Sequence, residues 1–164
     1  YLVVKDQVTT VGVLESTTFV KEYFLVPAAK GGVVNLPSVI YDVDKFDLLQ
    51  ASKDSLETAY QTLVDNPTLV AELRSHTDAR PTRTYKGGNK ELSQLRAQSC
   101  VNYLIQRGID PARLVPVGRG SDEPVIAMDL IKKMATKEEQ EAAHQRNRRT
   151  DLKVLSYDFV PKAN

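Results

Sequence analysis

The sequence has few of the side chains on which catalysis, metal binding and disulfide bonding usually depend. Its 164 residues include one cysteine, two histidines and no tryptophan. Because Cys100 is alone, the chain can form neither an internal disulfide nor a cysteine-based metal cluster. Lys and Arg number 22 and Asp and Glu 21, so the formal net charge is +1. This balance argues against a general nucleic-acid binder and against a membrane-surface binder.

Long apolar runs are also missing. No segment approaches the roughly 20 consecutive apolar residues that a membrane-spanning helix needs. Apolar residues make up 41% and charged residues 26% of the sequence, which is typical of a folded globular domain. The length suits one domain with a short additional segment. Because the sequence begins at Tyr1 rather than Met, we interpret it as a fragment of a longer protein whose targeting or lipid-anchoring segment lies elsewhere.

The first part of the sequence differs in pattern from the rest. Residues 1–36 are rich in Val, Thr and aromatic residues and include two strand-like runs, at 11–14 and 19–26. Pro27 and the glycines that follow Lys30 interrupt this pattern. We therefore predict a β-rich N-terminal extension, or the end of a preceding domain, over 1–36 and a separate domain over 37–164.

From residue 37 onward, strand-like runs alternate with helical spacing, and such alternation implies helices packed on a sheet. Ser52 is a plausible N-cap for the first helix, and residues 136–139 fit a capping box at the start of the last one. Gly108 stands where a residue just past a helix end belongs. The predicted strands lie at 39–43, 69–75, 113–117 and 150–155, and the predicted helices lie between 52 and 66, from 89 to 107 and from 136 to 143.

Candidate catalytic groups are few. The two histidines, His76 and His144, are far apart in the sequence, and a metal site needs about three or four protein ligands. Cys100 lies beside the apolar stripe of a predicted helix, so we expect a buried, inert thiol rather than a nucleophile. We predict no enzyme activity, no metal and no cofactor.

An acidic and a basic residue lie at neighbouring element ends. Asp78 follows a predicted strand, and Arg96 lies on the next helix. A carboxylate can hold an ammonium group, and a guanidinium can hold a carboxylate through two parallel hydrogen bonds, so the pair suits a zwitterionic ligand. The alternative is a structural Asp78–Arg96 salt bridge, and the spacing alone favours neither. We expect both side chains to be exposed.

Several motifs resemble, in the same order, those of the OmpA C-terminal-like (peptidoglycan-associated) domain family. The resemblance covers about residues 37–157. It rests on residues 75–78 (SHTD), 89–97 (NKELSQLRA), 101–104 (VNYL), 108–114 (GIDPARL), 118–120 (GRG) with Pro124, and 147–149 (NRR).

The resemblance implies an α+β fold of β-α-β-α-β-β order, with helices on a mixed sheet, that binds peptidoglycan non-covalently and catalyses nothing. The implied ligand is the diaminopimelate residue of the stem peptide, with Arg96 on a carboxylate and Asp78 on an ammonium group. The implied role is to anchor an outer-membrane-associated protein or secretion complex to the cell wall, on the periplasmic side of the outer membrane. Further candidates for lining the pocket are Tyr41, Asp42, Thr77, Ala79, Asn89, Leu92 and Arg148.

The sequence departs from the family in places that surround this site. Pro81 stands where a glycine is usual, residues 86–88 resemble an insertion, and 127–137 form a longer segment that we expect to cover the sheet. Residues 138–155 resemble the Bacteroidetes branch of the family, which implies partners in the type IX secretion machinery or other outer-membrane proteins. The alternative function is a protein–protein scaffold module with a vestigial pocket, in which 1–36 would dock a partner.

Overall fold

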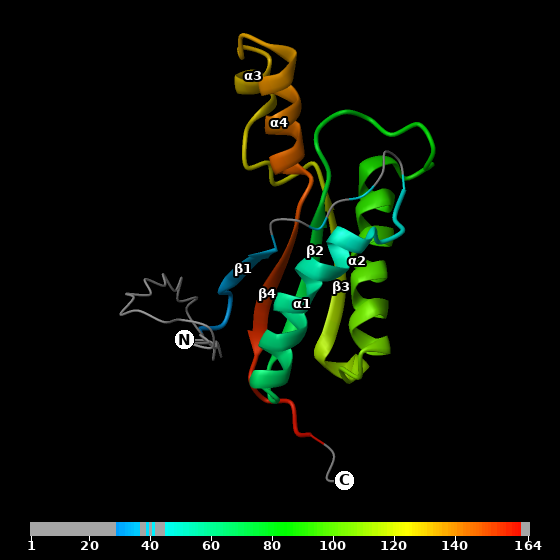
Figure 1. Ribbon diagram of the computed structural model, residues 1–164, viewed down its shortest axis with the longest axis vertical. Coiled ribbons are helices and arrows are strands. Elements are labelled where there is room, and N and C mark those ends of the chain that lie inside the picture. The colour runs from blue at the N-terminus through cyan, green and yellow to red at the C-terminus, as the bar shows by residue number, and fades with distance from the viewer. Residues whose placement is uncertain (1–28, 37–38, 40, 42–44, 162–164) are drawn as a thin grey trace, which may run out of the picture.

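The computed structural model describes residues 29–36, 39, 41 and 45–161, and Figure 1 shows their arrangement. The predicted alternation of strands and helices is confirmed. In chain order the elements are β1 (Val33–Leu36), α1 (Gln50–Asp65), β2 (Val70–His76), α2 (Gly88–Gln106), a short 3-10 helix (Pro111–Arg113), β3 (Leu114–Gly120), α3 (Met128–Ile131), α4 (Lys137–Asn147) and β4 (Thr150–Ser156).

The four described strands form one mixed sheet in the order β1-β4-β2-β3. β2 and β3 run parallel, whereas β4 is antiparallel to both of its neighbours, β1 and β2. Helices α1 and α2 pack against one face of this sheet (Figure 1). This is the α+β architecture that the resemblance to the family implied.

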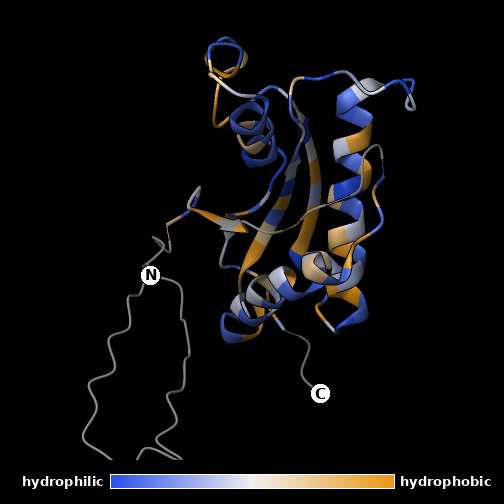
Figure 2. Cartoon of the chain, turned by 45° about the horizontal axis from the view of Figure 1, so that its top comes forward, coloured by the Kyte–Doolittle hydropathy of each residue, from blue (hydrophilic) through white to orange (hydrophobic). Residues whose placement is uncertain are grey.

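The core lies between that face of the sheet and the two helices. Leu69, Ala71 and Leu73 alternate along the predicted strand at 69–75, and all three are fully buried. Leu152 and Val154 of β4 face the same way. Figure 2 shows apolar residues on the strands and on the helices that pack against them. Burying each leucine stabilises the fold by about 1.5–3 kcal/mol.

Helix α2 lies unusually close to β3, and this contact fixes where the helix begins relative to the sheet. A Cβ atom on Gly118 would lie 2.4 Å from the backbone nitrogen of Gln94, so only glycine fits there. The Gln94 side chain accepts from the Gly118 amide at 2.7 Å and donates to the Pro116 carbonyl at 3.1 Å. The first turns of α2 are therefore held beside the carboxyl ends of β2 and β3.

The strand expected at 39–43 is wrong where it can be checked. Val39 and Tyr41 are not in a strand, and residues 40, 42 and 43 lie outside the described residues. The amide of Val39 instead donates to the Leu36 carbonyl at 3.5 Å. The pairing strand is β1, which lies earlier in the chain.

Strand β1 belongs to the part of the sequence predicted as an extension. It pairs with β4 from Val33 opposite Lys153 to Leu36 opposite Thr150, so the last four residues of 1–36 share the sheet with the rest. Residues 1–28 lie outside the described residues. The division into a β-rich extension at 1–36 and a domain at 37–164 stays a prediction.

Two helix ends also differ from the prediction. Helix α1 begins at Gln50, so Ser52 is buried inside the first turn and is not the N-cap. Helix α4 has the predicted capping box at Thr136 and Glu139 but runs on to Asn147 instead of ending at 143. The Asn147 side chain accepts from the Ile126 amide at 2.9 Å and donates to its carbonyl at 2.8 Å. This fixes the helix end to the preceding loop.

Residues 127–137 do not cover the sheet as expected. They hold α3, which packs with α4 beyond the end of the sheet where β2 and β3 finish (Figure 1). Ile131 is buried in this α3–α4 lobe, whereas Leu130 is exposed. No helix among the described residues combines the length and apolar character needed to cross a membrane.

Candidate functional site

A pocket of about 540 Å³ opens at this end of the sheet. The loop after β2, the first half of α2 and the end of α4 form its walls. Its lining residues are Tyr41, Thr77, Asp78, Arg80, Pro81, Thr82, Asn89, Leu92, Arg96, Glu141 and Arg148.

The elements of the fold explain why these side chains meet. Thr77 and Asp78 come directly after the last residue of β2. Asn89, Leu92 and Arg96 are spaced by three and four residues, which places them on one face of α2. Because the Gly118 contact holds α2 against β3, this face is directed at the end of β2.

Asp78 is a buried carboxylate surrounded by arginine donors. Arg80 donates to it from its backbone amide at 2.9 Å, from Nε at 3.0 Å and from Nη2 at 2.8 Å. Arg148 donates from Nη1 at 2.5 Å. Burial alone would raise the pKa of Asp78, but the hydrogen bonds from the two arginines outweigh it and lower that pKa to about 2. Asp78 is therefore ionised at neutral pH.

Glu141 on α4 completes a closed network of charges. It accepts from Arg80 Nη1 at 2.7 Å and from Arg148 Nη2 at 2.7 Å. These hydrogen bonds, that of Arg80 first, lower the pKa of Glu141. Two carboxylates and two guanidinium groups thus alternate around one rim of the pocket, which we call the rim network (Asp78, Arg80, Glu141 and Arg148).

Arg96 lies on another wall and is also buried. Its Nε donates to the Lys45 carbonyl at 2.9 Å, and its guanidinium carbon lies 4.5 Å from the centroid of the Tyr41 ring. A guanidinium over an aromatic face is attracted by the negative charge of the ring face. The ring and the carbonyl together fix the direction of the Arg96 side chain.

Asn89 fixes the loop that carries Asp78. Its side-chain nitrogen donates to the carbonyls of Asp78 at 3.1 Å and Arg80 at 3.0 Å, and its side-chain oxygen accepts from the Thr82 amide at 3.3 Å. One asparagine therefore holds the loop at three points. Leu92, one turn along α2, is buried and contributes an apolar surface.

Thr77 offers a polar group that the described part of the chain does not use. Its backbone amide donates to the Gly120 carbonyl at 2.8 Å, which continues the pattern of β2 and β3. Its hydroxyl is buried in the pocket wall and has no hydrogen-bond partner among the described residues. A buried hydroxyl without a hydrogen-bond partner lowers the stability of the fold. A ligand that formed a hydrogen bond with this hydroxyl would therefore bind more tightly.

The pocket brings together most of the residues that the sequence singled out for it. Asp42 lies outside the described residues, and Ala79 is exposed and does not line the pocket. The predicted residues that do line it are Tyr41, Thr77, Asp78, Asn89, Leu92, Arg96 and Arg148.

The expected exposure of Asp78 and Arg96 is wrong. Asp78 is 6% exposed and Arg96 is 3% exposed. Among the described residues, Asp78 forms ion pairs with Arg80 and Arg148 rather than with Arg96, and His144 Nδ1 lies 3.9 Å from its Oδ1. Arg80 lies only two residues after Asp78 in the loop that follows β2. Its backbone amide and its guanidinium both donate to the Asp78 carboxylate.

Four lining residues were not among the predicted candidates: Arg80, Pro81, Thr82 and Glu141. The spacing of Glu141 and Arg148 could have indicated that their side chains lie together. They are seven residues apart, which is about two helical turns and places both on one face. Because the predicted helix ended at 143, before Arg148, this relationship was not part of the prediction.

The predicted burial of Cys100 is confirmed. Cys100 is fully buried in α2, and burial raises the pKa of its thiol to about 11, so it stays protonated and unreactive. His76 is buried at the end of β2, where its Nε2 lies 3.1 Å from Asp151 Oδ2. Neither residue lines the pocket.

Comparison with known proteins places this fold and pocket in context. The OmpA family model matches residues 40–147. The peptidoglycan-associated lipoprotein of Pseudomonas aeruginosa is 32% identical over 113 residues, which cover 69% of this chain and 59% of that protein. The structure of the peptidoglycan-associated lipoprotein from Burkholderia pseudomallei matches with a TM-score of 0.55 and 26% identity, over 71% of this chain and 87% of that chain.

A third relative shares the fold at lower identity. The structure of the cell wall anchor of the T6SS from Pseudomonas aeruginosa matches with a TM-score of 0.58 and 23% identity, over 76% of this chain and 80% of that chain. The chain spans less than two thirds of the Pseudomonas lipoprotein, at 59% of its length. The match to the family model runs over more than half of the chain and includes the pocket residues from Tyr41 to Glu141, and the chain therefore belongs to the OmpA family.

Proposed function

We propose that this domain binds peptidoglycan non-covalently by holding the diaminopimelate residue of its stem peptide. The observation that carries the proposal is the presence of a buried carboxylate, Asp78, and a buried guanidinium, Arg96, in the walls of one pocket. Diaminopimelate carries an ammonium group and a carboxylate on an apolar chain. Its charges therefore match the two walls.

Each part of the ligand would have a counterpart in the pocket. Arg96 would hold the carboxylate through parallel hydrogen bonds, and Asp78 would accept from the ammonium group. The Thr77 hydroxyl, which has no partner among the described residues, would bond to a polar atom of the ligand. Leu92 would pack against the methylene groups.

The names of the relatives support a role in anchoring. They include peptidoglycan-associated lipoproteins and the cell wall anchor of a secretion system. We infer that this domain anchors an outer-membrane-associated protein or complex to the cell wall from the periplasmic side, without catalysis. The resemblance of residues 138–155 to the C-terminal module of PorE, an outer-membrane lipoprotein, supports the type IX secretion machinery as that complex.

A single site of this kind would bind with modest affinity. Each charge-assisted hydrogen bond contributes about 1.5–3 kcal/mol, and ligand ordering and desolvation offset much of that sum. Many tethered copies on one polymer would then bind tightly together through their effective concentration. A reversible hold suits a wall that is continually remodelled.

One observation favours the alternative, a scaffold module with a vestigial pocket. The hydrogen bonds to the Asp78 carboxylate already come from Arg80 and Arg148 of the chain itself. In a protein whose pocket no longer binds a ligand, such a carboxylate could remain as part of a purely structural ion pair. The two functions differ in whether a stem peptide binds at all.

Calorimetric titration would separate them. We expect a stem peptide with diaminopimelate to bind, and the same peptide with lysine to bind at least tenfold more weakly, because lysine lacks the carboxylate that Arg96 would hold. Arg96→Lys keeps the charge but loses the planar fork and should weaken binding of the first peptide only. If a folded domain binds neither peptide, the proposal is wrong and the scaffold function takes its place.

A further inference from the structure

The Asp78 carboxylate has no acceptor position left for a ligand. Its Oδ1 accepts from the backbone amide and Nε of Arg80, and its Oδ2 accepts from Nη2 of Arg80 and Nη1 of Arg148. A carboxylate has about four lone-pair positions in total. An incoming ammonium group must therefore remove a donor that is already bound.

We propose that Arg80 is an internal competitor that occupies the ammonium position at Asp78 and sets the affinity and selectivity of the pocket. This inference rests on the proposed function, because it assumes that a ligand cation binds at Asp78. Arg80 would leave the carboxylate when that cation arrives and return when it departs.

The structure indicates which of the two arginines would leave. The side chain of Arg80 is 46% exposed, whereas that of Arg148 is 22% exposed. Arg148 also donates to Gln145 and to Glu141 within the α4 region. The more exposed guanidinium on the loop has the lower cost of movement.

Glu141 can hold the Arg80 guanidinium after it leaves Asp78. Arg80 donates to Glu141 through Nη1 at 2.7 Å, using a nitrogen that does not contact Asp78. A small rotation of the side chain can release Asp78 while this second ion pair persists. The exchange then trades one charged donor at Asp78 for another and leaves no buried charge unpaired.

This exchange would select against ligands that carry only a cation. A guanidinium makes two parallel hydrogen bonds to a carboxylate, and a lone ammonium group gains little by replacing it. A ligand that also offers a carboxylate to Arg96 gains a second anchor that Arg80 does not supply. The pocket would thus require both charges of the zwitterion at once.

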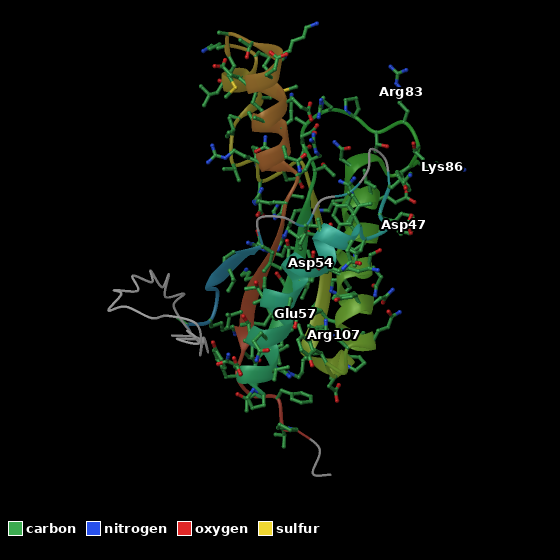
Figure 3. The ribbon with its side chains drawn as sticks, in the orientation of Figure 1. Asp47, Asp54, Glu57, Arg83, Lys86 and Arg107 are labelled. Atoms are coloured by element: carbon green, nitrogen blue, oxygen red, sulfur yellow. The ribbon has the colours of Figure 1, made fainter. Side chains whose placement is uncertain are left out.

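The test compares two substitutions on the same loop. Arg80→Gln removes the guanidinium but keeps the backbone amide that donates to Asp78. Arg83→Gln is the matched control, because it removes the same charge from an exposed side chain that points away from the ribbon at the tip of the loop (Figure 3). Both variants and the unaltered domain are titrated with the diaminopimelate stem peptide.

We expect Arg80→Gln to lower the Kd by roughly two- to fivefold, the range that corresponds to a partly exposed ion pair. Arg83→Gln should leave the Kd unchanged. Tighter binding by Arg80→Gln alone supports the inference. Equal or weaker binding by a folded Arg80→Gln domain, with the unaltered domain still binding, overturns the inference and leaves the proposed function intact. If no variant binds, both fail.

Discussion

The guanidinium carbon of Arg96 lies 4.5 Å from the centroid of the Tyr41 ring, and the hydroxyl of the same tyrosine donates to the Arg96 backbone carbonyl at 3.2 Å. One aromatic residue therefore holds both the side chain and the backbone of this arginine. The hydroxyl also lies 3.1 Å from the Cys100 sulfur. Burial is the main cause that raises the pKa of Tyr41 well above its usual value, so the hydroxyl remains a donor.

Two substitutions at Tyr41 separate the ring from the hydroxyl. Tyr41→Phe keeps the ring under Arg96 and loses the hydroxyl bonds, so we expect a loss of about 1 kcal/mol in unfolding free energy with little change in peptide affinity. Tyr41→Leu also removes the cation–π contact, worth about 0.5–2 kcal/mol, and should weaken peptide binding severalfold. Urea unfolding and calorimetry measure the two effects. Equal affinities for the two variants would show that the ring does not orient Arg96.

Acid should destabilise the domain partly through Asp78. The pKa of Asp78 falls from its usual 3.8 to about 2 on folding, so the ionised form is favoured in the folded state. Its stabilising contribution is complete above about pH 4 and is lost as the pH falls toward 2, for a total of about 2 kcal/mol. Asp78→Asn should therefore flatten the decrease of unfolding free energy between pH 4 and 2. An unchanged slope in this variant would contradict the ion pairs described here.

The loop over the pocket should depend on the Asn89 side chain. Asn89→Asp keeps the acceptor for the Thr82 amide but loses the donors to the Asp78 and Arg80 carbonyls. It also adds a negative charge to a pocket that already holds the Asp78 carboxylate. We expect faster hydrogen exchange of loop amides and at least a fivefold loss of peptide affinity, about 1 kcal/mol. Unaltered exchange over 78–82 would mean that the loop is held by other contacts.

Gly118 should not tolerate a side chain. Alanine there would place Cβ 2.4 Å from the Gln94 amide nitrogen, which forces α2 away from β3. Overpacking of this kind costs about 1–3 kcal/mol, which urea unfolding can measure. Since α2 carries Arg96 and Asn89, a folded Gly118→Ala domain should also bind the peptide more weakly. A variant with unaltered stability and affinity would show that the close approach is not needed.

The sequence predicted those parts of the fold in which the spacing of apolar residues fits only one kind of secondary structure. The alternation of Leu69, Ala71 and Leu73 requires a strand with one buried face, and β2 confirms it. The expected strand at 39–43 failed because a short Val-rich run fits a strand, a turn or a buried coil equally well. Only pairing with β4 decides between them, and pairing is not visible in local spacing.

The site was predicted less completely than the fold. Leu92 and Arg96 were predicted for the pocket through the resemblance to the family, and the regular spacing of α2 places both on one face. The burial of Asp78 and its bonds to Arg80 depend on how an irregular loop folds back, which no periodicity encodes. Arg148 follows α4 two turns after Glu141 only because the helix continues to Asn147, and a tertiary contact with Ile126 fixes that end.

The rim network has a consequence for how quickly a ligand is found. Its two carboxylates and two guanidinium groups cancel one another, and the chain as a whole has a formal net charge of +1. Long-range attraction, which accelerates association and weakens steeply with ionic strength, has little net charge to act through. The encounter rate of this rim with a zwitterion should therefore change little with salt. Local concentration, set by tethering near the polymer, would govern capture instead.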